Sequence, residues 1–379
     1  MSNPVTSVDP QHATRADRRS SFRVADIPVP KGREEDWRFT PMRRIKHLFE
    51  PGDYRGRAQT SVSAPEVVTV EHVGRDDARL GKVLAPGDRT AVVSWATFEE
   101  STIVTISEET ELDEPIVVTV SATAELASQH LLIVAEKFAR GTVVLRHSGP
   151  ATLNQTVEIR VEDGAHLDVV AVHEWDRDAV HASNHRVSVG RDASIDHHVV
   201  TLGGDLVRVC VDTEYTAPGG EMRLNGIYFV DAQQHLEHRV FVDHSQPKCF
   251  SRVTYKGALQ GKNAHSVWVG DCLIGPNGDE TDTYELNRNL ILTEGAKADS
   301  IPNLEIENGE IEGAGHASAT GRFDDDQLFY LMSRGISAVD ARKLVVRGFF
   351  AELINKIGVR DLREHLLSAI ESELDTQTN

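Results

Sequence analysis

The chain has 379 residues, 40 of them basic and 59 acidic, so its formal net charge at neutral pH is −19. Phosphate backbones and anionic membrane surfaces repel such an acidic chain, and we expect neither nucleic acid nor a membrane as a partner. No apolar run approaches the roughly 20 residues that span a bilayer. The three cysteines lie far apart, so we expect neither a disulfide framework nor a four-thiolate cluster site. These features together favour a cytoplasmic protein.

The N-terminal part is predicted to be a disordered lead-in over residues 1–27, because it is polar, mixed in charge and without an apolar secretory segment. Residues 28–95 are predicted to form a mixed region with short helices. The acidic run 34–36 favours a helix N-terminus, and Pro41 opens another helical stretch. Trp37 and Phe39 are expected to form a local aromatic pair that anchors this region to the body.

From Val67 to Leu304 the pattern becomes short, β-branched and alternating, which predicts strands almost throughout. The clearest predicted strands cover residues 67–73, 91–95, 101–106, 115–122, 130–136, 142–147, 156–162, 167–175, 185–190, 195–202 and 208–215.

The turns between these strands recur at quasi-regular spacing. Gly164 and Asp192 are 28 positions apart, and Asp192 and Gly219 are 27 apart. Such spacing indicates either a solenoid or a pair of β-sandwiches. The large number of strands and the scarcity of aromatic residues favour the solenoid. We therefore predict a mainly β protein with a right-handed parallel β-helix core over residues 96–321.

After Gly321 the apolar period changes from 2 to 3.6, which predicts a helical domain over residues 322–379. The acidic run 324–326 opens the first helix, and Ser337 with Asp340 forms a capping box for the second. The helices carry more apolar residues than they can bury among themselves. We expect these faces either to cap the solenoid or to dock another protein.

His316 is the strongest candidate for chemistry, because Gly313 and Gly315 permit a close backbone approach in a turn. The segment 235–249, which holds three histidines and Cys249, is a weaker candidate for a mononuclear zinc or iron site. Its HxxH spacing places His235 and His238 on opposite faces of a strand. Phosphate-loop, GxSxG and HExxH motifs are not found in the sequence, so we expect a protein that is not an enzyme.

Three segments resemble the SufD members of the SufB/SufD family of iron–sulfur cluster assembly scaffolds. They are REEDWRFTP at 33–41, TDTYELNRNLILTEGAKADSIPNLEIENGEI at 281–311, and GAGHASATGRFDDDQLFYLMSRGISAVDARKLVVRGFF at 313–350. The N-terminal segment is similar to the signature that separates SufD from its paralogue SufB. The family's SufB is usually longer and carries a cysteine near its C-terminal end, whereas no cysteine follows Cys272 here.

The resemblance implies a scaffold that pairs with SufB through the β-helix, binds the ATPase SufC through its C-terminal helices, and forms a homodimer when alone. It implies His316 as a metal ligand at the interface with SufB, where a cluster is held transiently and no cofactor is kept permanently. Many relatives carry a cysteine where this chain has Ala314. Combining the resemblance with the helical spacing, we predict the SufC-docking residues Leu328, Phe329, Tyr330, Met332, Arg334, Arg347, Phe349 and Phe350.

Two alternatives from other classes stay open. A carbohydrate-active enzyme on a β-helix would need acidic and basic residues clustered on one face of consecutive coils. A mononuclear metalloprotein would use the histidines and the cysteine of segment 235–249. Metal analysis of the isolated chain separates the second from a scaffold, which is expected to purify nearly free of metal.

Overall fold

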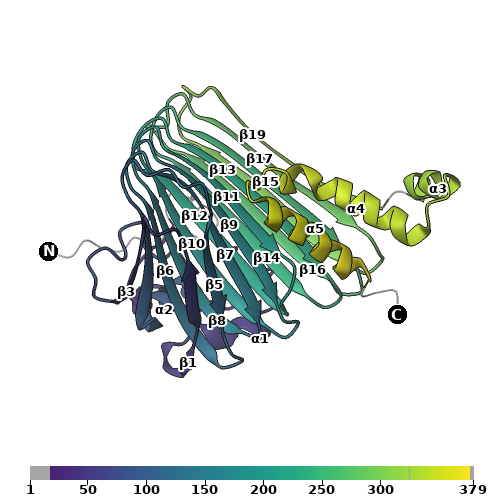
Figure 1. Ribbon diagram of the computed structural model, residues 1–379, viewed down its shortest axis with the longest axis horizontal. Helices are drawn as coiled ribbons and strands as arrows, with labels where there is room; N and C mark the ends of the chain where they lie inside the picture. Colours follow the sequence, from purple (N-terminus) through teal and green to yellow (C-terminus); the bar gives the residue numbers. More distant parts are fainter. Residues whose placement is uncertain (1–17, 324, 376–379) are drawn as a thin grey trace.

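The computed structural model describes residues 18–323 and 325–375. Its body is a parallel β-solenoid of two sheets (Figure 1), which confirms the predicted β-helix. Sheet A contains, in spatial order, β3 (Val68–Gly74), β4 (Glu100–Ile106), β6 (Leu126–Ala135), β8 (Thr152–Val161), β10 (Val180–Val189), β12 (Leu206–Tyr215), β14 (His235–His244), β16 (His265–Ile274) and β18 (Lys297–Ile306), with β1 (Gly56–Arg57) beside β6. Sheet B contains β2 (Gln59–Ser63), β5 (Ile116–Ser121), β7 (Arg140–Gly149), β9 (His166–Trp175), β11 (Ser194–Thr201), β13 (Glu221–Val230), β15 (Phe250–Leu259), β17 (Asp282–Ile291) and β19 (Gly313–Arg322).

The chain alternates between the two sheets, so each strand pairs in parallel with the strand two places before it. Only β2 with β5 and β3 with β4 pair antiparallel among the described strands, and these pairs close the N-terminal end. The sheets thus begin before residue 96. The predicted turn residues Gly164, Asp192 and Gly219 all have positive φ values, of 68°, 51° and 83°, which reverse the chain between strands.

Strand length is nearly constant along the solenoid, whereas the distance between coils is not. Most strands from β6 onward contain 10 residues. Successive strands of sheet A start 26 positions apart at Leu126 and Thr152, but 32 positions apart at His265 and Lys297. The additional residues therefore lie in the corners between the strands, and the sheets keep their register.

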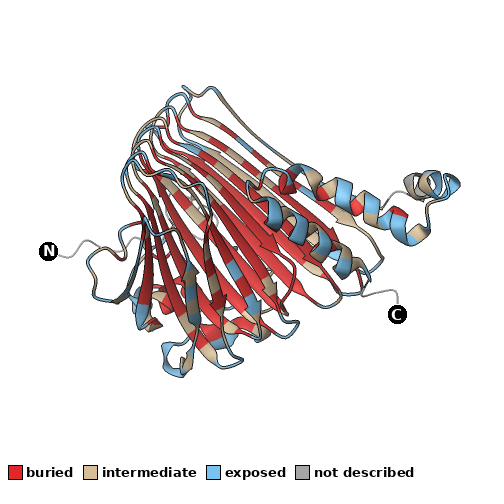
Figure 2. Cartoon of the chain, viewed as in Figure 1, coloured by how far each residue is buried: buried red, intermediate tan, exposed pale blue. Residues whose placement is uncertain are grey.

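The interior is filled by inward-facing residues of both sheets, and Figure 2 shows the strands buried along most of their length. Near the C-terminal end, tyrosine rings lie flat over glycines of the neighbouring strand. A methyl group on Gly257 would lie 1.8 Å from the Tyr228 ring, and one on Gly226 would lie 2.0 Å from the Tyr255 ring. These glycines are needed for close approach rather than for an unusual backbone conformation.

Gly257→Ala is expected to lower the free energy of unfolding by about 3 kcal/mol, because the Tyr228 ring is fully buried and cannot move aside. Gly348→Ala is the matched control, since nothing lies within 4 Å of its methyl position in helix α4 (Ala338–Ile354) outside the backbone of that helix. That change should raise the same quantity by about 1 kcal/mol through helix propensity. Urea unfolding of both variants checks the prediction, and equal midpoints would contradict it.

Two local predictions in the N-terminal region are wrong. Residues 91–95, predicted as a strand, belong to helix α2 (Arg89–Thr97), because the Asp88 side chain caps the first turn by accepting a hydrogen bond from the Ala91 amide. Residues 34–36 form turns rather than a helix, since the Glu34 carboxylate accepts from the amides of Lys31 and Arg33. The short elements that follow are α1 (Met42–Ile45), η3 (Lys46–Leu48) and η4 (Pro51–Asp53).

The predicted aromatic pair of Trp37 and Phe39 is also wrong, because Trp37 pairs with Phe49 instead. Trp37 is buried, but its ring packs edge-on against Phe49 at 5.1 Å, while Phe39 is half-buried. The Arg208 guanidinium lies 4.1 Å from the Trp37 ring. Trp37 therefore anchors the N-terminal segment to the outer face of sheet A.

The prediction of a disordered lead-in over residues 1–27 is wrong for residues 18–27, and its part at 1–17 lies outside the described residues. Arg18 forms a 2.9 Å ion pair with Asp212 on β12, and the 3-10 turn η2 (Val24–Asp26) precedes the buried Ile27. Residues 18–27 therefore lie against the body.

Three C-terminal helices follow β19: α3 (Asp325–Ser333), α4 (Ala338–Ile354) and α5 (Arg360–Asp375). The predicted capping box is present, since the Ser337 hydroxyl accepts from the Asp340 amide. Helices α4 and α5 cover the outer face of sheet B, and α3 extends away from the solenoid (Figure 1). Asp324, part of the predicted acidic start, lies outside the described residues. No helix in the described ranges combines the length and apolar character of a membrane span.

Candidate functional site

The C-terminal end of the solenoid is open. Among the described strands, none lies beyond β18 in sheet A or beyond β19 in sheet B. The backbone edges of both strands therefore have no strand partner on one side, and the inward-facing residues of the last coil are not covered by another coil. Exposed strand edges are sites where another chain can add strands.

His316 lies on β19 at this open end, not in the predicted turn. It pairs in register with Glu285 on β17. A methyl group on Gly315 would lie 3.1 Å from the Tyr284 ring, which places Gly315 and Tyr284 together on the outer face. Since faces alternate along a strand, His316 and Glu285 both face inward. His316 is nevertheless exposed, because no strand among the described residues stacks on the last coil.

Glu285 is the unusual group directly beneath this histidine. The residue is 1% exposed, and neither carboxyl oxygen has a hydrogen-bond partner among residues 18–323 and 325–375. Burial and, to a lesser extent, the negative charge of Asp271 together raise the pKa of the Glu285 carboxyl to about 8. Glu285 is not predicted from the sequence as a site residue, because the direction of its side chain depends on the register of β17.

The cysteines do not form a ligand set. Cys210, Cys249 and Cys272 are all free and buried. Burial raises the pKa of the Cys272 thiol to about 12, and the nearby Glu285 carboxyl adds to this shift. Cys272 lies 3.5 Å from the Thr283 hydroxyl and is a small buried side chain.

Two of the four candidate ligands in segment 235–249, His235 and His238, lie on different faces of β14. His238 faces the interior and stacks on Tyr228 at 4.9 Å. His235 faces outward and lies 3.3 Å from the Glu237 carboxylate, which also pairs with Arg208 at 3.2 Å. His235 and His238 therefore lie on opposite faces of the strand, as the HxxH spacing predicts. The outward-facing residues of the segment form an ion-pair network that holds the N-terminal region.

Histidines fill a long part of the interior. His147 and His173 stack at 4.5 Å, His173 and His181 lie 5.2 Å apart, and His185 contacts His197 through a 2.9 Å hydrogen bond. Burial lowers the pKa of each of these imidazoles, so all are neutral at pH 7. They pack as neutral rings inside the solenoid.

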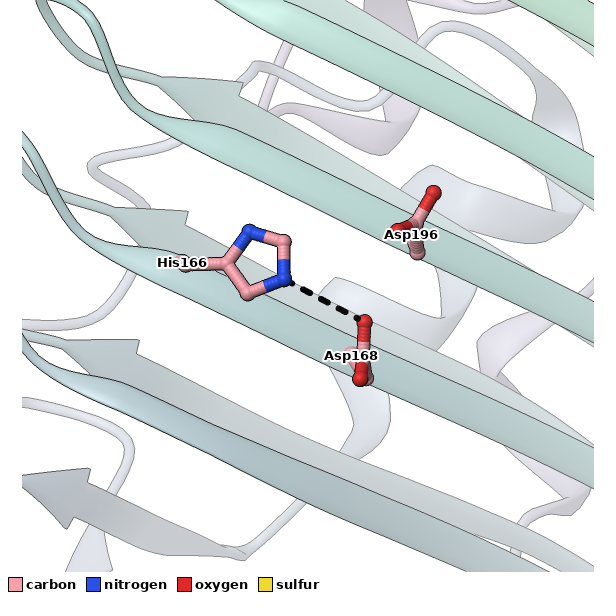
Figure 3. A group of neighbouring side chains, drawn as sticks. All are labelled: His166, Asp168 and Asp196. Carbon is pink, nitrogen blue, oxygen red and sulfur yellow. Dashed lines mark ion pairs between the residues drawn. The ribbon is translucent and has the colours of Figure 1, made fainter. Parts of the chain in front are cut away.

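One group of side chains among the described residues has the spacing of cation ligands. His166 and Asp168 on β9 and Asp196 on β11 offer ligand atoms within 4.8 Å of one another (Figure 3). Each member already has a partner in the chain: His166 the Ser194 hydroxyl, Asp168 the Thr142 hydroxyl at 3.5 Å, and Asp196 the Arg223 guanidinium at 4.0 Å. These contacts account for the group without an ion.

The predicted docking residues divide into two sets. On α3, Phe329 is 72% exposed, Tyr330 57% and Met332 45%, while Leu328 is half-buried. Arg334 donates to the Tyr330 hydroxyl at 2.8 Å and belongs to the same exposed surface.

The members on α4 are largely engaged within the chain. Phe350 is fully buried against sheet B, so its assignment to an exposed docking surface is wrong. Phe349 is half-buried beside Lys256, whose ammonium lies 5.4 Å from its ring. Arg347 pairs with Glu371 on α5 at 3.1 Å.

Comparison with known proteins gives a consistent result. A family model described as "SUF system FeS cluster assembly, SufBD core domain" matches residues 117–349. An iron–sulfur cluster assembly SufBD family protein of Mycobacterium bovis is 49% identical over 366 residues, covering 94% of this chain and 92% of the relative. A protein of the same description from Mycobacterium leprae is 49% identical over 364 residues, with 94% and 93% covered. The iron–sulfur cluster assembly protein SufD of Escherichia coli is 27% identical over 216 residues, which are 57% of this chain and 51% of that protein.

Proposed function

Because the chain belongs to the SufBD family of iron–sulfur cluster assembly proteins, we propose that it is a non-catalytic scaffold subunit of a Suf complex. It pairs with a SufB-like paralogue at the open end of its solenoid and binds a SufC-like ATPase through its C-terminal helices. The nascent cluster is cargo that forms between the two scaffold subunits and then leaves, so this chain keeps no cofactor of its own.

The observation that carries the proposal is the position of His316. Its exposed imidazole stands on the uncovered inner face of the last coil, on β19. The outer edges of β18 and β19 have no strand partner among the described residues. A paralogue that adds its strands to these edges would cover the imidazole and bring its own ligands to it. Cys272 does not supply a thiolate from this subunit, because the pKa of its thiol is raised, and position 314 is an alanine, which has no thiol.

A single imidazole suits a scaffold. It binds iron more weakly than thiolate does and is lost on protonation, so the cluster can be released. Dividing the ligands between two chains also allows a movement of the subunits to open the site. The exposed apolar residues of α3, which extends from the body, support the second part of the proposal, a docking contact with the ATPase.

His316→Ala is expected to reduce cluster assembly about 100-fold, because it removes the only ligand proposed for this subunit. The measurement is the absorbance of the cluster after reconstitution of the three-component complex with ferrous iron and sulfide. His72→Ala is the control, since His72 is also exposed but lies on β3 at the other end of sheet A. Unchanged assembly in His316→Ala, with all subunits present, would overturn the proposal.

A further inference from the structure

The Glu285 carboxyl group has no structural explanation within the described chain. Burying a polar group without a hydrogen-bond partner destabilises the fold, and more so when the group is charged. Oε2 lies close to the backbone of Gly270, where a methyl group would be 2.8 Å from it. The Trp268 ring lies beside the same glycine, but its N–H has no hydrogen-bond partner among the described residues and therefore does not donate to Glu285. A carboxyl group in this state, one coil below an open end, indicates that a donor reaches it when the site is complete.

The other inward polar groups of β17 already have partners. Thr283 exchanges a 2.6 Å hydrogen bond with Ser251. Asn287 donates to the Tyr228 hydroxyl at 2.9 Å and accepts from Asn289 at 2.8 Å. Glu285 is therefore the inward member of this strand with unused hydrogen-bonding capacity among the described residues.

The side chain in register with Glu285 that can supply a donor is His316. The two residues are register partners on adjacent parallel strands and face the same side. Such partners stand about 4.8 Å apart at the backbone, and both side chains are long enough to close this distance by rotation alone. No backbone movement is required for an imidazole N–H to donate to a Glu285 oxygen.

We propose that Glu285 is the positioning residue for His316 and accepts one imidazole N–H, so that the other ring nitrogen is presented to iron. The inference rests on the proposed function of His316. Histidines that bind metals in proteins almost always donate their second nitrogen to a carboxylate, a carbonyl or water, which fixes both tautomer and orientation. The same bond gives the buried carboxyl its missing partner. A carboxyl oxygen accepts the imidazole N–H, whereas a Gln amide can instead donate its own N–H to the ring, so Gln at this position does not fix the tautomer.

The first test is spectroscopic and does not depend on cluster assembly. The full chain, labelled with ¹⁵N in its imidazoles, is combined with its unlabelled paralogue, and His316 is assigned by comparison with His316→Ala. We expect a single dominant tautomer in the native chain and a mixture in Glu285→Gln. Glu285→Asp should restore part of the tautomer preference. Glu307→Gln, an exposed carboxyl at the same end, is the matched control. The same tautomer population in native and Glu285→Gln chains would overturn the inference.

The second test measures cluster assembly on the three-component complex. Glu285→Gln is expected to lower assembly about tenfold, less than His316→Ala, because it misorients the ligand without removing it. If His316→Ala has no effect, the proposed function fails. If His316→Ala lowers assembly and Glu285→Gln does not, only the present inference fails.

Stability separates positioning from a structural role. Gln is neutral and nearly isosteric, so Glu285→Gln should unfold at the same urea concentration as the native chain or at a higher one, and should recover the same amount of complex. A lower midpoint together with a lower yield of complex would assign Glu285 to folding and overturn the inference.

Discussion

Lowering the pH from 7 to 5 is expected to unfold this chain. Burial lowers the pKa of His197, His238 and His244 to about 3 and that of His147 and His198 to about 4. It also lowers the pKa of three further imidazoles, those of His173, His181 and His185, well below the usual value.

The sign follows from proton uptake. An unfolded histidine takes up its proton near pH 6.5, whereas the buried ones stay neutral down to about pH 3–4. The unfolded state therefore binds more protons between these limits, and the stability that is fully present above pH 6.5 is lost as the pH falls. At pH 5 each buried imidazole costs about 2 kcal/mol relative to pH 7. Several such terms together exceed the roughly 5–15 kcal/mol of a typical domain.

Six carboxyls among the described residues act in the opposite direction, since burial raises the pKa of each: Asp168, Asp196, Glu214, Asp243, Glu285 and Glu373. The two largest shifts are those of Glu285 and Glu214. Burial raises the pKa of Glu285 to about 8 and that of Glu214 to about 7. Their folded forms gain stability as the pH falls from these values toward the unfolded pKa near 4.5. These two groups offset about two of the imidazoles, and the smaller shifts of the other four carboxyls leave the net effect of acid destabilising.

Urea unfolding followed by circular dichroism from pH 7.5 to pH 4.5 measures this loss. His173→Leu should shift the acid midpoint to lower pH, because both ring nitrogens of His173 are buried without hydrogen-bond partners. His72→Leu, at an exposed position, should leave it unchanged. A chain that stays equally stable down to pH 4.5 would contradict the account.

Phe350→Ala and Phe329→Ala are expected to have opposite effects. Phe350 is fully buried between α4 and the outer face of sheet B, so its truncation should cost about 3–5 kcal/mol of unfolding free energy. Phe329 is 72% exposed on α3, and its truncation should change the free energy by less than about 0.5 kcal/mol.

The binding result should be reversed. Phe329→Ala should weaken capture of the SufC-like ATPase by about tenfold or more, as for an aromatic residue at the centre of an interface. The measurement is co-purification and titration of the purified subunits. Phe350→Ala should retain ATPase binding at temperatures where it is folded. Full binding by Phe329→Ala, or loss of binding by folded Phe350→Ala, would place the contact on another surface.

The sequence predicts the solenoid well, because alternation of β-branched residues and recurring turns such as Gly164 and Gly219 are local signals. The prediction of a strand at residues 91–95 is wrong. The valines there are typical of a strand, but the Asp88 side chain caps the first turn of a helix and stabilises it. The sequence also does not predict β19, whose small residues have low strand propensity. That strand forms because β17 offers a paired edge in register.

The site was predicted only in part for the same reason. The apolar pattern of residues 328–350 shows that the helices have apolar faces that must pack against something. Only the packing on sheet B shows that Phe350 is buried within the chain whereas Phe329 is exposed. His316 is visible from its resemblance to known relatives. Glu285 is visible only once the register shows that it shares a face with His316, since neighbours across a sheet are 31 positions apart in sequence.

The strands of the solenoid have nearly constant length, whereas its corners vary, so the corners are the positions where residues can be inserted. Residues added at a corner, as between His265 and Lys297, alter one coil and leave every other coil unshifted. A duplication or deletion of a whole coil would likewise preserve both termini of the stack. The overall length of such a solenoid, and with it the distance between its two ends, can therefore change while the residues of its terminal coil stay the same.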